Sequence, residues 1–397
     1  MARPRILLAW ELGGGLGHLA PLRVLSRHLK TRGWDCVWAV RNLDATTRFL
    51  AADGNEAIQH LHQAPIAQDE PRHPVAVQLN YASTLFSCGY DDPLPLAVRL
   101  KAWAALIERS GCMRIIADHA PSAVLAGRLL GLPVAVSGTG FSVPPRITPF
   151  PGYLPEADAA VMLENERKIT TIINQALALL GAAPLAQLQD LFAGCFNGLF
   201  TYPETDRYGE HRGAGHLGLH DLSHGAPVLW GNSREPKVFA MLNPAPGTEA
   251  LLTALAALPV QALVKVRGIA PEKLAALKRP GWVVTDQAVS VRHAMENCDL
   301  FIGHGAHGSV VEALLAGKPQ LMLPDQRERL MLAQRLTSIG VGLSLPKADA
   351  STYGSTMRQL LDNPAPRAAA AAVAARHAGQ ARGRILHDWC DAALAAG

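Results

Sequence analysis

The stretch CDLFIGHGAHGSVVEALLAGKP, which runs from Cys298 to Pro319, constrains the fold more than any other part of the chain. An apolar run, a short glycine-rich loop and an amphipathic segment follow one another there, which predicts a buried strand, a tight turn and a helix. The first N–H groups of such a helix lack intrahelical partners, and the helix dipole is positive at that end. The pattern is typical of α/β proteins that hold an anion at the start of a helix.

Apolar runs alternate with amphipathic segments along most of the chain, which predicts βα units and mostly parallel sheets. The strands expected in the first half are Arg5–Ala9, Asp35–Val40, Met113–Ala117 and Val134–Val136. The helices expected there are His18–Thr31, Asp44–Ala52, Pro95–Ser110, Ser122–Leu130 and roughly Glu156–Leu180. The strands expected in the second half are Val238–Leu242, Val260–Val266, Trp282–Thr285, Leu300–Ile302 and Gln320–Leu323. The helices expected there are Glu249–Ala257, Glu272–Leu277, Val291–Glu296, Gly308–Ala316 and Arg327–Ile339.

The length of 397 residues favours two domains over one. Residues 202–236 are rich in Gly, His, Pro and Asp and lack periodicity, so we expect the chain to pass between the domains there. The predicted division is an amino-terminal Rossmann-like domain over residues 1–205, a connection over residues 206–236 and a carboxy-terminal Rossmann-like domain over residues 237–397. The alanine-rich tail from Arg367 is expected to end the second domain with a packed helix.

Composition and charge exclude several functional classes. The chain is 49% hydrophobic and 18% charged, with a net charge of only +4 and no block of Lys or Arg, so neither nucleic-acid binding nor a membrane-surface role is indicated. Six cysteines lie apart without CxxC spacing, which indicates neither a disulfide framework nor a zinc site and favours a reducing cytoplasm. No stretch of about 18 apolar residues is present, so no transmembrane helix is expected; peripheral contact with a membrane stays open.

A second glycine-rich loop follows the first expected strand, in GGGLGHLAPLRVLSRHLKTRGW from Gly13 to Trp34. Its glycines allow a sharp turn and a close approach of the backbone to a ligand. His18 falls where the helix begins. The spacing differs from GxGxxG, and the second strand ends in VWAVRN without an acidic residue, which speaks against a dinucleotide-dependent oxidoreductase.

Together, the loop with His18 and the segment HGAHGSVVEALLAGKP resemble the GT-B nucleotide-sugar glycosyltransferases, in particular the family 1 UDP-glycosyltransferases and their bacterial natural-product relatives. The likeness spans nearly the whole chain in motif order and is thin over residues 55–95 and 141–236. It implies an α/β fold of two Rossmann-like domains facing a cleft. It also implies transfer of a sugar, with inversion, from a UDP- or dTDP-sugar to a hydroxyl group of a small or amphipathic acceptor. The resemblance further implies that the protein acts in the cytoplasm and needs neither a cofactor nor a metal. Whether the protein is a monomer or a homodimer stays open.

The resemblance assigns the catalytic base to His18, because the first-loop His of the family deprotonates the acceptor hydroxyl. An imidazole suits this task near neutral pH. The family supports that His with an Asp at the end of a later strand, which maps to Asp118 in RIIADHAPSAVLAGRLLGLPVAV. Such a carboxylate fixes the ring tautomer and stabilises the imidazolium. The alternatives are that His18 only bonds the start of its helix and that Asp118 caps the next helix.

The donor site is assigned by the same resemblance. Glu312 maps to the carboxylate that binds the ribose hydroxyls, the alternative being a solvated helix residue, and the backbone near Val289 maps to the base site. His307 departs from the family pattern and is expected at the surface. The residues assigned to the diphosphate are His304, Gly305, Gly308 and Ser309, with Gly15 of the first loop and Asn243 after the strand that begins the second half.

The family places an Asp-Gln pair that contacts the donor sugar four and five residues after a proline. Counting from Pro324 gives Glu328 and Arg329, and we expect these two to contact the sugar, although the nearer pair Asp325 and Gln326 stays an alternative. An Arg in this position suits a carboxylate, so a uronic acid donor is conceivable. That idea fails if Arg329 pairs with a structural Asp.

Aromatic and polar side chains of the first half are expected to shape the acceptor site, with ordinary core packing as the alternative. They are Asn80, Tyr81, Phe86, Tyr90, Trp103, Phe141, Phe150 and Tyr153. Two rival functions share the fold. A non-hydrolysing nucleotide-sugar epimerase would need other acids in the cleft, and a non-catalytic nucleotide-sugar-binding protein would not need His18 beside Asp118.

Overall fold

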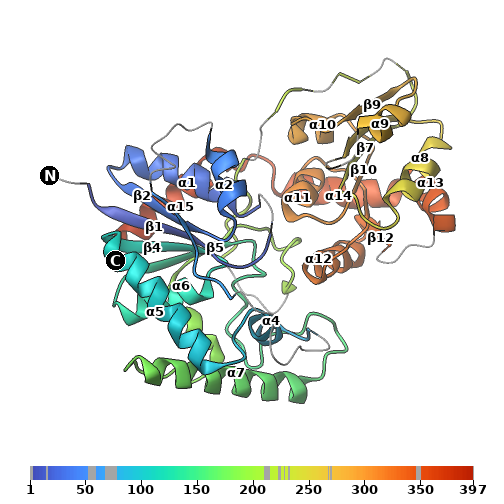
Figure 1. Ribbon diagram of the computed structural model, residues 1–397. Coiled ribbons are helices and arrows are strands. Elements are labelled where there is room, and N and C mark those ends of the chain that lie inside the picture. Colours follow the sequence, from blue (N-terminus) through green and yellow to red (C-terminus); the bar gives the residue numbers. More distant parts are fainter. Residues whose placement is uncertain are drawn as a thin grey trace. The chain divides into compact units, whose positions relative to one another are not determined.

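The chain folds into two compact units, each built around its own six-stranded parallel sheet (Figure 1). The first unit comprises Met1–Thr201, Glu210–His220 and Gly383–Gly397, and the second comprises Tyr202–Gly209 and Asp221–Arg382. The computed structural model describes residues 3–14, 17–51, 60–67, 78–209, 215–221, 225–227, 229–230, 233–266, 268, 271–345 and 350–396.

The sheet of the first unit has the strand order β3-β2-β1-β4-β5-β6. Its strands are β1 (Arg5–Trp10), β2 (Asp35–Val40), β3 (Leu61–Gln63), β4 (Cys112–Asp118), β5 (Val134–Gly138) and β6 (Phe196–Leu199). Strand β1 pairs with β4 so that Trp10 lies opposite Asp118. Because parallel strands end at the same edge, the loops that follow β1 and β4 meet there.

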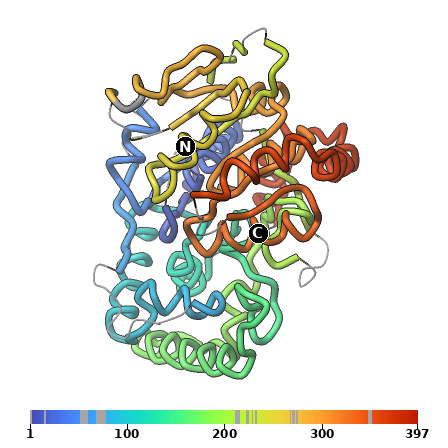
Figure 2. Tube along the Cα trace, turned by 90° about the vertical axis from the view of Figure 1, so that its right-hand side faces the viewer, coloured from blue at the N-terminus to red at the C-terminus, as the bar shows by residue number. Residues whose placement is uncertain are grey.

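Helices cover both faces of this sheet, and β1 shows why. Ile6, Leu8 and Trp10 pack on one face, whereas Leu7 and Ala9 pack on the other, as the alternation of side chains along a strand requires. The first face carries α1 (Leu19–Thr31) and α15 (Ile385–Ala395), which lie side by side in Figure 1. The other carries α4 (Tyr81–Ser87), α5 (Pro93–Arg109), α6 (Pro121–Leu129) and α7 (Ala159–Leu179). Figure 2 shows α7, in green, running along one end of the first unit.

The sheet of the second unit has the order β12-β11-β10-β7-β8-β9. Its strands are β7 (Lys237–Leu242), β8 (Gln261–Val266), β9 (Trp282–Thr285), β10 (Leu300–Gly303), β11 (Gln320–Met322) and β12 (Gly342–Ser344). Its helices are α8 (Thr248–Ala256), α9 (Pro271–Ala276), α10 (Val291–Glu296), α11 (His307–Leu315), α12 (Arg327–Ser338), α13 (Tyr353–Asp362) and α14 (Pro364–Arg376). Strands β7 and β10 are neighbours, so their carboxyl ends lie together at the centre of the sheet.

The predicted α/β fold class with two Rossmann-like parallel sheets is confirmed. Each strand and helix expected in the two halves is present within a few residues, including α2 (Leu43–Leu50). Among the described strands and α-helices, those that were not expected are β3, β6, β12, α4 and α13. The missed strands have only three or four residues and lie at or near the outside of their sheets, so they carry too short an apolar pattern to be recognised.

The expected place of the terminal helix is wrong, because α15 packs on the first unit and not on the second. Its Trp389 lies against Gly198, where an added Cβ would sit 2.6 Å from the indole, and its Nε1 donates to the carbonyl oxygen of Asn197 at 3.0 Å. Because Gly198 has no side chain, the indole ring of Trp389 can pack against its backbone. The predicted connection over residues 206–236 is not a separate segment between the units. Residues 202–209 belong to the second unit, and residues 216–220 belong to the first.

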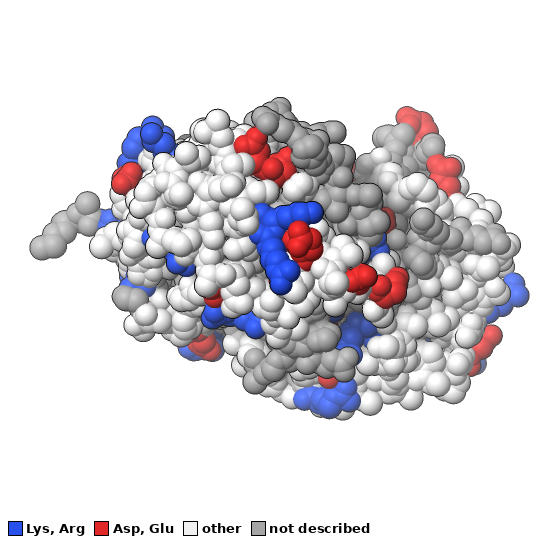
Figure 3. Space-filling model, turned by 90° about the horizontal axis from the view of Figure 1, so that it is seen from below, with Lys and Arg blue, Asp and Glu red and all other residues white. Residues whose placement is uncertain are grey.

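On the face drawn in Figure 3, Lys and Arg side chains lie singly or beside Asp and Glu, among many uncharged residues. The described residues on that face form no extended patch of one sign. Within the described parts of the chain, every helix is too short or too polar to cross a membrane.

Candidate active site

The loops after β1 and β4 bring His18 and Asp118 together. His18 stands directly before α1 and Asp118 is the last residue of β4, and His18 Nδ1 lies 2.8 Å from Asp118 Oδ1. The Asp118 side chain is 6% exposed and that of His18 22%. The ring of His18 also stacks on Trp10, with 5.5 Å between the ring centroids. An ionised carboxylate only accepts, so Nδ1 carries the proton and a neutral His18 offers the lone pair of Nε2.

The two structural alternatives for this pair are wrong. The His18 side chain makes no capping hydrogen bond to α1. The residue that precedes α6 is Ala120, and no side chain caps that helix. The pair is therefore an oriented imidazole beside a buried carboxylate, which is the arrangement of a general base and its supporting acid.

Gly13 makes the space that this imidazole needs. Its φ is +80°, and an added Cβ would lie 2.6 Å from His18 Nε2. By contrast, a Cβ on Gly14 would meet nothing within 4 Å. Sequence reasoning singled out the glycines of this loop for contact with a ligand, but Gly13 instead makes room for the base. Gly15, assigned to the diphosphate, lies outside the described residues.

A buried carboxyl group fixes the two loops to each other. Glu11 accepts hydrogen bonds from the backbone N–H of Ser122 at 2.8 Å and from its hydroxyl at 2.5 Å, and Arg99 Nε lies 3.8 Å away. Beside it, the Leu12 N–H donates to the carbonyl oxygen of His119 at 2.9 Å. Burial raises the pKa of Glu11 to about 7, outweighing the opposite effects of Arg99 and Ser122. Buried hydrogen bonds therefore join the two loops that carry His18 and Asp118.

In the second unit, the loop between β10 and α11 holds the residues assigned to the diphosphate. His304 is buried, and its Nδ1 lies 3.0 Å from the carbonyl oxygen of Leu323, which can only accept. No described residue bonds its buried Nε2. Gly305 has φ of +80° and a Cβ there would lie 3.2 Å from the Arg329 carbonyl oxygen, so glycine is required. Ala306 has φ of −65° and is unstrained.

Helix α11 begins directly after this loop. Its first helical hydrogen bond runs from Val310 N to Ala306 O, so the N–H groups of His307, Gly308 and Ser309 precede it. No acidic residue stands in this first turn, and the N-cap Ala306 makes no side-chain bond. The Ser309 hydroxyl donates to the Ala306 carbonyl. The positive end of α11 is therefore open to an anion. The expectation that His307 lies at the surface is wrong, because the residue is buried.

Asn243 and Val289 lie in different surroundings. Asn243 is exposed and directly follows β7, whose Met241 pairs with Gly303 of β10, so Asn243 lies at the same sheet edge as His304. Val289 is buried in an apolar cluster with the aromatic side chains of β7 and β10, and its backbone forms a bridge with Ala226. Only its backbone is therefore placed to meet a base.

Glu312, assigned to the ribose, is 4% exposed and is not a solvated helix residue. It accepts hydrogen bonds from both terminal nitrogens of Arg382, one at 3.1 Å, and Arg292 Nε lies 4.0 Å away. Burial lowers the pKa of Arg382 and the Glu312 carboxylate raises it, and the carboxylate prevails. Arg382 was missed from the sequence, because nothing local relates two residues that lie seventy positions apart.

Both residues assigned to the donor sugar are engaged in ion pairs. Glu328 Oε1 lies 2.7 Å from Nη2 of Arg207, whose side chain is 1% exposed. Arg329 Nη1 donates to both carboxylate oxygens of Asp325, at 2.7 and 3.0 Å. The uronic acid hypothesis required an Arg329 free of such a partner, so it is wrong. Gln326 stands at the N-cap of α12 but makes no capping bond.

The residues expected to shape the acceptor site mostly form the core of the first unit. Of these eight, all but Phe86 are buried, since α4, α5 and the segment before α7 pack over the sheet. Tyr81 and Phe141 approach the ring of His119, and Phe141 stacks on Tyr153. The alternative of core packing therefore holds for most of them.

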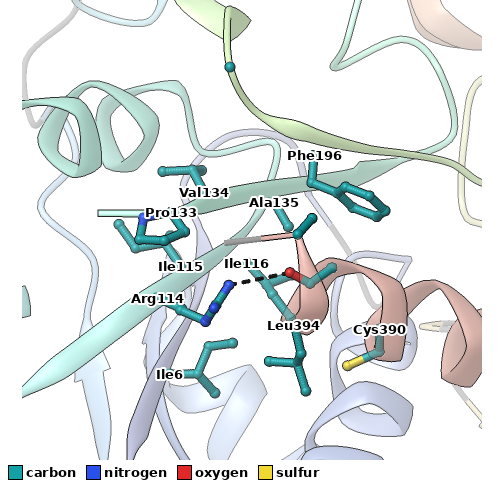
Figure 4. A pocket seen from close by; sticks show the side chains of 13 residues that line it. Ile6, Arg114, Ile115, Ile116, Pro133, Val134, Ala135, Phe196, Cys390 and Leu394 are labelled. Carbon is teal, nitrogen blue, oxygen red and sulfur yellow. Dashed lines mark hydrogen bonds between the residues drawn. The ribbon is translucent and has the colours of Figure 1, made fainter. Parts of the chain in front are cut away.

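Two further observations bound the site. Among the described residues, no group of three His, Cys, Asp or Glu side chains is placed to hold a metal ion. A cavity of about 60 Å³ lies in the first unit, between the starts of β4 and β5 and helix α15 (Figure 4). Arg114 lines it and donates a hydrogen bond to the carbonyl oxygen of Ala393 at 3.3 Å. It is at the amino ends of the strands, opposite to Asp118, and has room for only about two water molecules.

Comparisons with known proteins agree with this architecture. Residues 249–384 match the family described as erythromycin biosynthesis protein CIII-like, C-terminal domain. NDP-glycosyltransferase YjiC of Bacillus subtilis (strain 168) is 38% identical over 63 residues, 16% of each chain. TDP-daunosamine transferase DnrS of Streptomyces peucetius is 30% identical over 129 residues, 32% of this chain and 30% of that protein. The matched stretches thus span less than a third of these relatives.

The likeness in structure extends over the whole chain. The crystal structure of the glycotransferase of kitacinnamycin superposes with a TM-score of 0.70 and 17% sequence identity, covering 99% of each chain. The chain therefore has the GT-B fold, and most of its second unit matches the erythromycin biosynthesis protein CIII-like domain. The predicted resemblance to GT-B glycosyltransferases of bacterial natural-product type is confirmed.

Proposed function

We propose that this protein is an inverting glycosyltransferase that moves a sugar from a UDP- or dTDP-sugar to a hydroxyl group of a small acceptor. The observation that carries the proposal is the His18–Asp118 pair at 2.8 Å, with Nε2 turned over Gly13. A binding protein that needs no base has no use for such a pair. The names of the relatives, NDP-glycosyltransferase and TDP-daunosamine transferase, support the same class of reaction.

In the proposed reaction, His18 Nε2 takes the proton of the acceptor hydroxyl while the oxygen attacks the anomeric carbon. The bond from that carbon to the diphosphate oxygen breaks on the opposite face, so the configuration inverts. Asp118 stabilises the imidazolium that forms. The diphosphate leaves with the bonding electrons, and its growing charge is stabilised by the first-turn N–H groups of α11.

The donor assignments follow from the second unit. His304, Gly305, Gly308 and Ser309 would hold the diphosphate, with Asn243 at the same sheet edge. Glu312 would accept hydrogen bonds from the ribose, and the backbone at Val289 would meet the base. Glu328, whose side chain is 37% exposed, remains our choice for the contact with the sugar. The positive end of α11 would supply the stabilisation of negative charge that a metal supplies elsewhere. The six free cysteines suit a reducing compartment such as the cytoplasm.

The two rivals differ in what they require. An epimerase would convert a UDP-sugar to its epimer without an acceptor, and a non-catalytic protein would bind the nucleotide and transfer nothing. The non-catalytic alternative required His18 to point into the core, away from Asp118, whereas the two side chains are hydrogen-bonded. We therefore keep the transferase as the proposal.

A transfer assay tests it. The full chain is incubated with UDP-, dTDP- and GDP-sugars and a panel of phenolic and aliphatic alcohols, and the glycoside is detected by mass spectrometry. We expect His18→Ala and Asp118→Asn each to lower kcat about a hundredfold or more. His62→Ala, on an exposed histidine of β3, is the matched control and should keep full activity. Epimer formed without acceptor, or transfer unchanged in His18→Ala, would contradict the proposal.

A further inference from the structure

His119, the residue that follows the catalytic Asp118, holds an unfavourable backbone conformation. Its φ is +47°, and no other non-glycine residue in the described part of the chain has a positive φ. Such a conformation is unfavourable by about 1–2 kcal/mol for a residue with a Cβ, and glycine or asparagine adopts it more easily. The contact that this backbone makes, from Leu12 N to His119 O, is available to any residue. The imidazole ring, and not the backbone, must therefore explain why histidine stands here.

The ring of His119 lies among aromatic side chains of the first unit. The residue is 8% exposed, and no described residue hydrogen-bonds its buried Nε2. Phe141 meets the ring edge-on, with 6.2 Å between the ring centroids. Tyr81 lies tilted beside it, with 6.1 Å between the ring centroids. Burial lowers the pKa of His119 to about 3, with a smaller contribution from His18. The ring thus stays neutral, with one nitrogen that donates and one that accepts.

Gly13 relates this ring to the catalytic base. An added Cβ on Gly13 would lie 2.6 Å from His18 Nε2 and 3.5 Å from His119 Nδ1. The two rings are 6.1 Å apart between centroids. Two imidazole nitrogens from separate loops therefore approach the space above Gly13, which has no side chain. A hydroxyl bound at His18 Nε2 has His119 Nδ1 as its neighbour.

We propose that His119 determines acceptor specificity, by hydrogen-bonding a second acceptor oxygen on the carbon next to the one whose hydroxyl reacts. The preferred acceptors are then vicinal diols and α-hydroxy ketones, or their aromatic counterparts. The proposal rests on the function proposed for His18. A neutral ring suits either kind of second oxygen, because the tautomer selects whether Nδ1 donates or accepts.

Two isomeric probes test this inference by binding alone, without any donor. 2,3-Dihydroxynaphthalene carries its hydroxyls on adjacent carbons and 2,7-dihydroxynaphthalene does not, while size and apolar area are the same. We expect the full chain to bind the 2,3-isomer about three- to tenfold more tightly, the ratio that one additional hydrogen bond gives. Titration calorimetry measures both dissociation constants.

Two variants assign the preference to His119. His119→Gly removes the ring and relieves the backbone, so the ratio should fall to about one. His119→Asn also tolerates positive φ and places an amide near the position of Nδ1, so it should keep most of the preference. Thermal melting confirms that each variant is folded. A ratio near one in the unmodified protein, no binding of either isomer, or a ratio unchanged in His119→Gly overturns the inference.

The same measurements separate this inference from the proposed function. Should the isomer ratio depend on His119 while no sugar nucleotide supports transfer, the transferase proposal fails and the binding role of His119 stands. Should transfer occur and depend on His18 with no isomer preference, the reverse holds.

Discussion

At the scale of single residues, the site depends on where side chains are absent as much as on where they are present. Gly13→Ala would place a Cβ 2.6 Å from His18 Nε2 and would hold alanine at φ of +80°. We expect a loss of stability of about 1–2 kcal/mol and a fall in kcat of tenfold or more, because the base must move. Gly14→Ala is the matched control, since its Cβ meets nothing within 4 Å. Chemical denaturation measures the stability of the two variants, and the transfer assay measures their kcat. Equal values for the two variants would show that the position of His18 does not depend on the space above Gly13.

A second residue-scale consequence concerns Glu11 and pH. Its pKa is raised from 4.5 to about 7 in the folded protein, so the folded state binds the proton more tightly than the unfolded chain. The contribution of Glu11 to stability is therefore complete below pH 4.5 and is lost as the pH rises to about 7, by about 3 kcal/mol in total. We expect Glu11→Gln to remove this part of the pH dependence. The free energy of unfolding of both proteins, measured between pH 4.5 and 8, gives a difference curve that must slope within that window.

At the scale of elements, Trp389 is one of several residues that hold α15 to the first unit, together with Asp391, which pairs with Arg32, and Ala393, which accepts from Arg114. Trp389 packs against Phe196 and Phe200 and bonds the backbone of Asn197. We expect Trp389→Ala to destabilise the protein by about 3–5 kcal/mol, because a large buried ring leaves a cavity. Trp389→Phe keeps a ring and loses the hydrogen bond, so a loss nearer to 1 kcal/mol is expected. Urea denaturation compares them, and a near-zero effect of both would contradict the packing of α15 on this sheet.

At the scale of the whole molecule, each unit has its own apolar core, so a nucleotide should stabilise them unequally. UDP or dTDP at a hundred times its Kd stabilises the conformation that it binds by about 2.7 kcal/mol. We expect amide hydrogen exchange to slow in β10 and α11 and to change least in α5 and α6. His304→Ala should weaken this protection at equal nucleotide concentration. Protection confined to the first unit would place the nucleotide elsewhere.

Much of this architecture follows from local sequence pattern. Alternating apolar segments predict the βα units, because one face or stripe of each element must be buried. The loop and helix from His304 to Glu312 are contiguous in sequence, so their anion-binding form is encoded locally. The short strands β3, β6 and β12 were not recognised, because their few residues carry no periodicity of their own.

The sequence alone therefore determined the fold class, the two glycine loops and the identity of the residues at their ends. The pairing of His18 with Asp118 was expected only from a family resemblance, and the structure shows the hydrogen bond between them. Only the tertiary structure decided that Glu312 meets Arg382 and that α15 packs on the first sheet. It also placed His119 beside the base, which no spacing rule indicates. The physical reason is that backbone pattern is a property of neighbours in sequence, whereas burial and ion pairing depend on how strands far apart in the chain are ordered in a sheet.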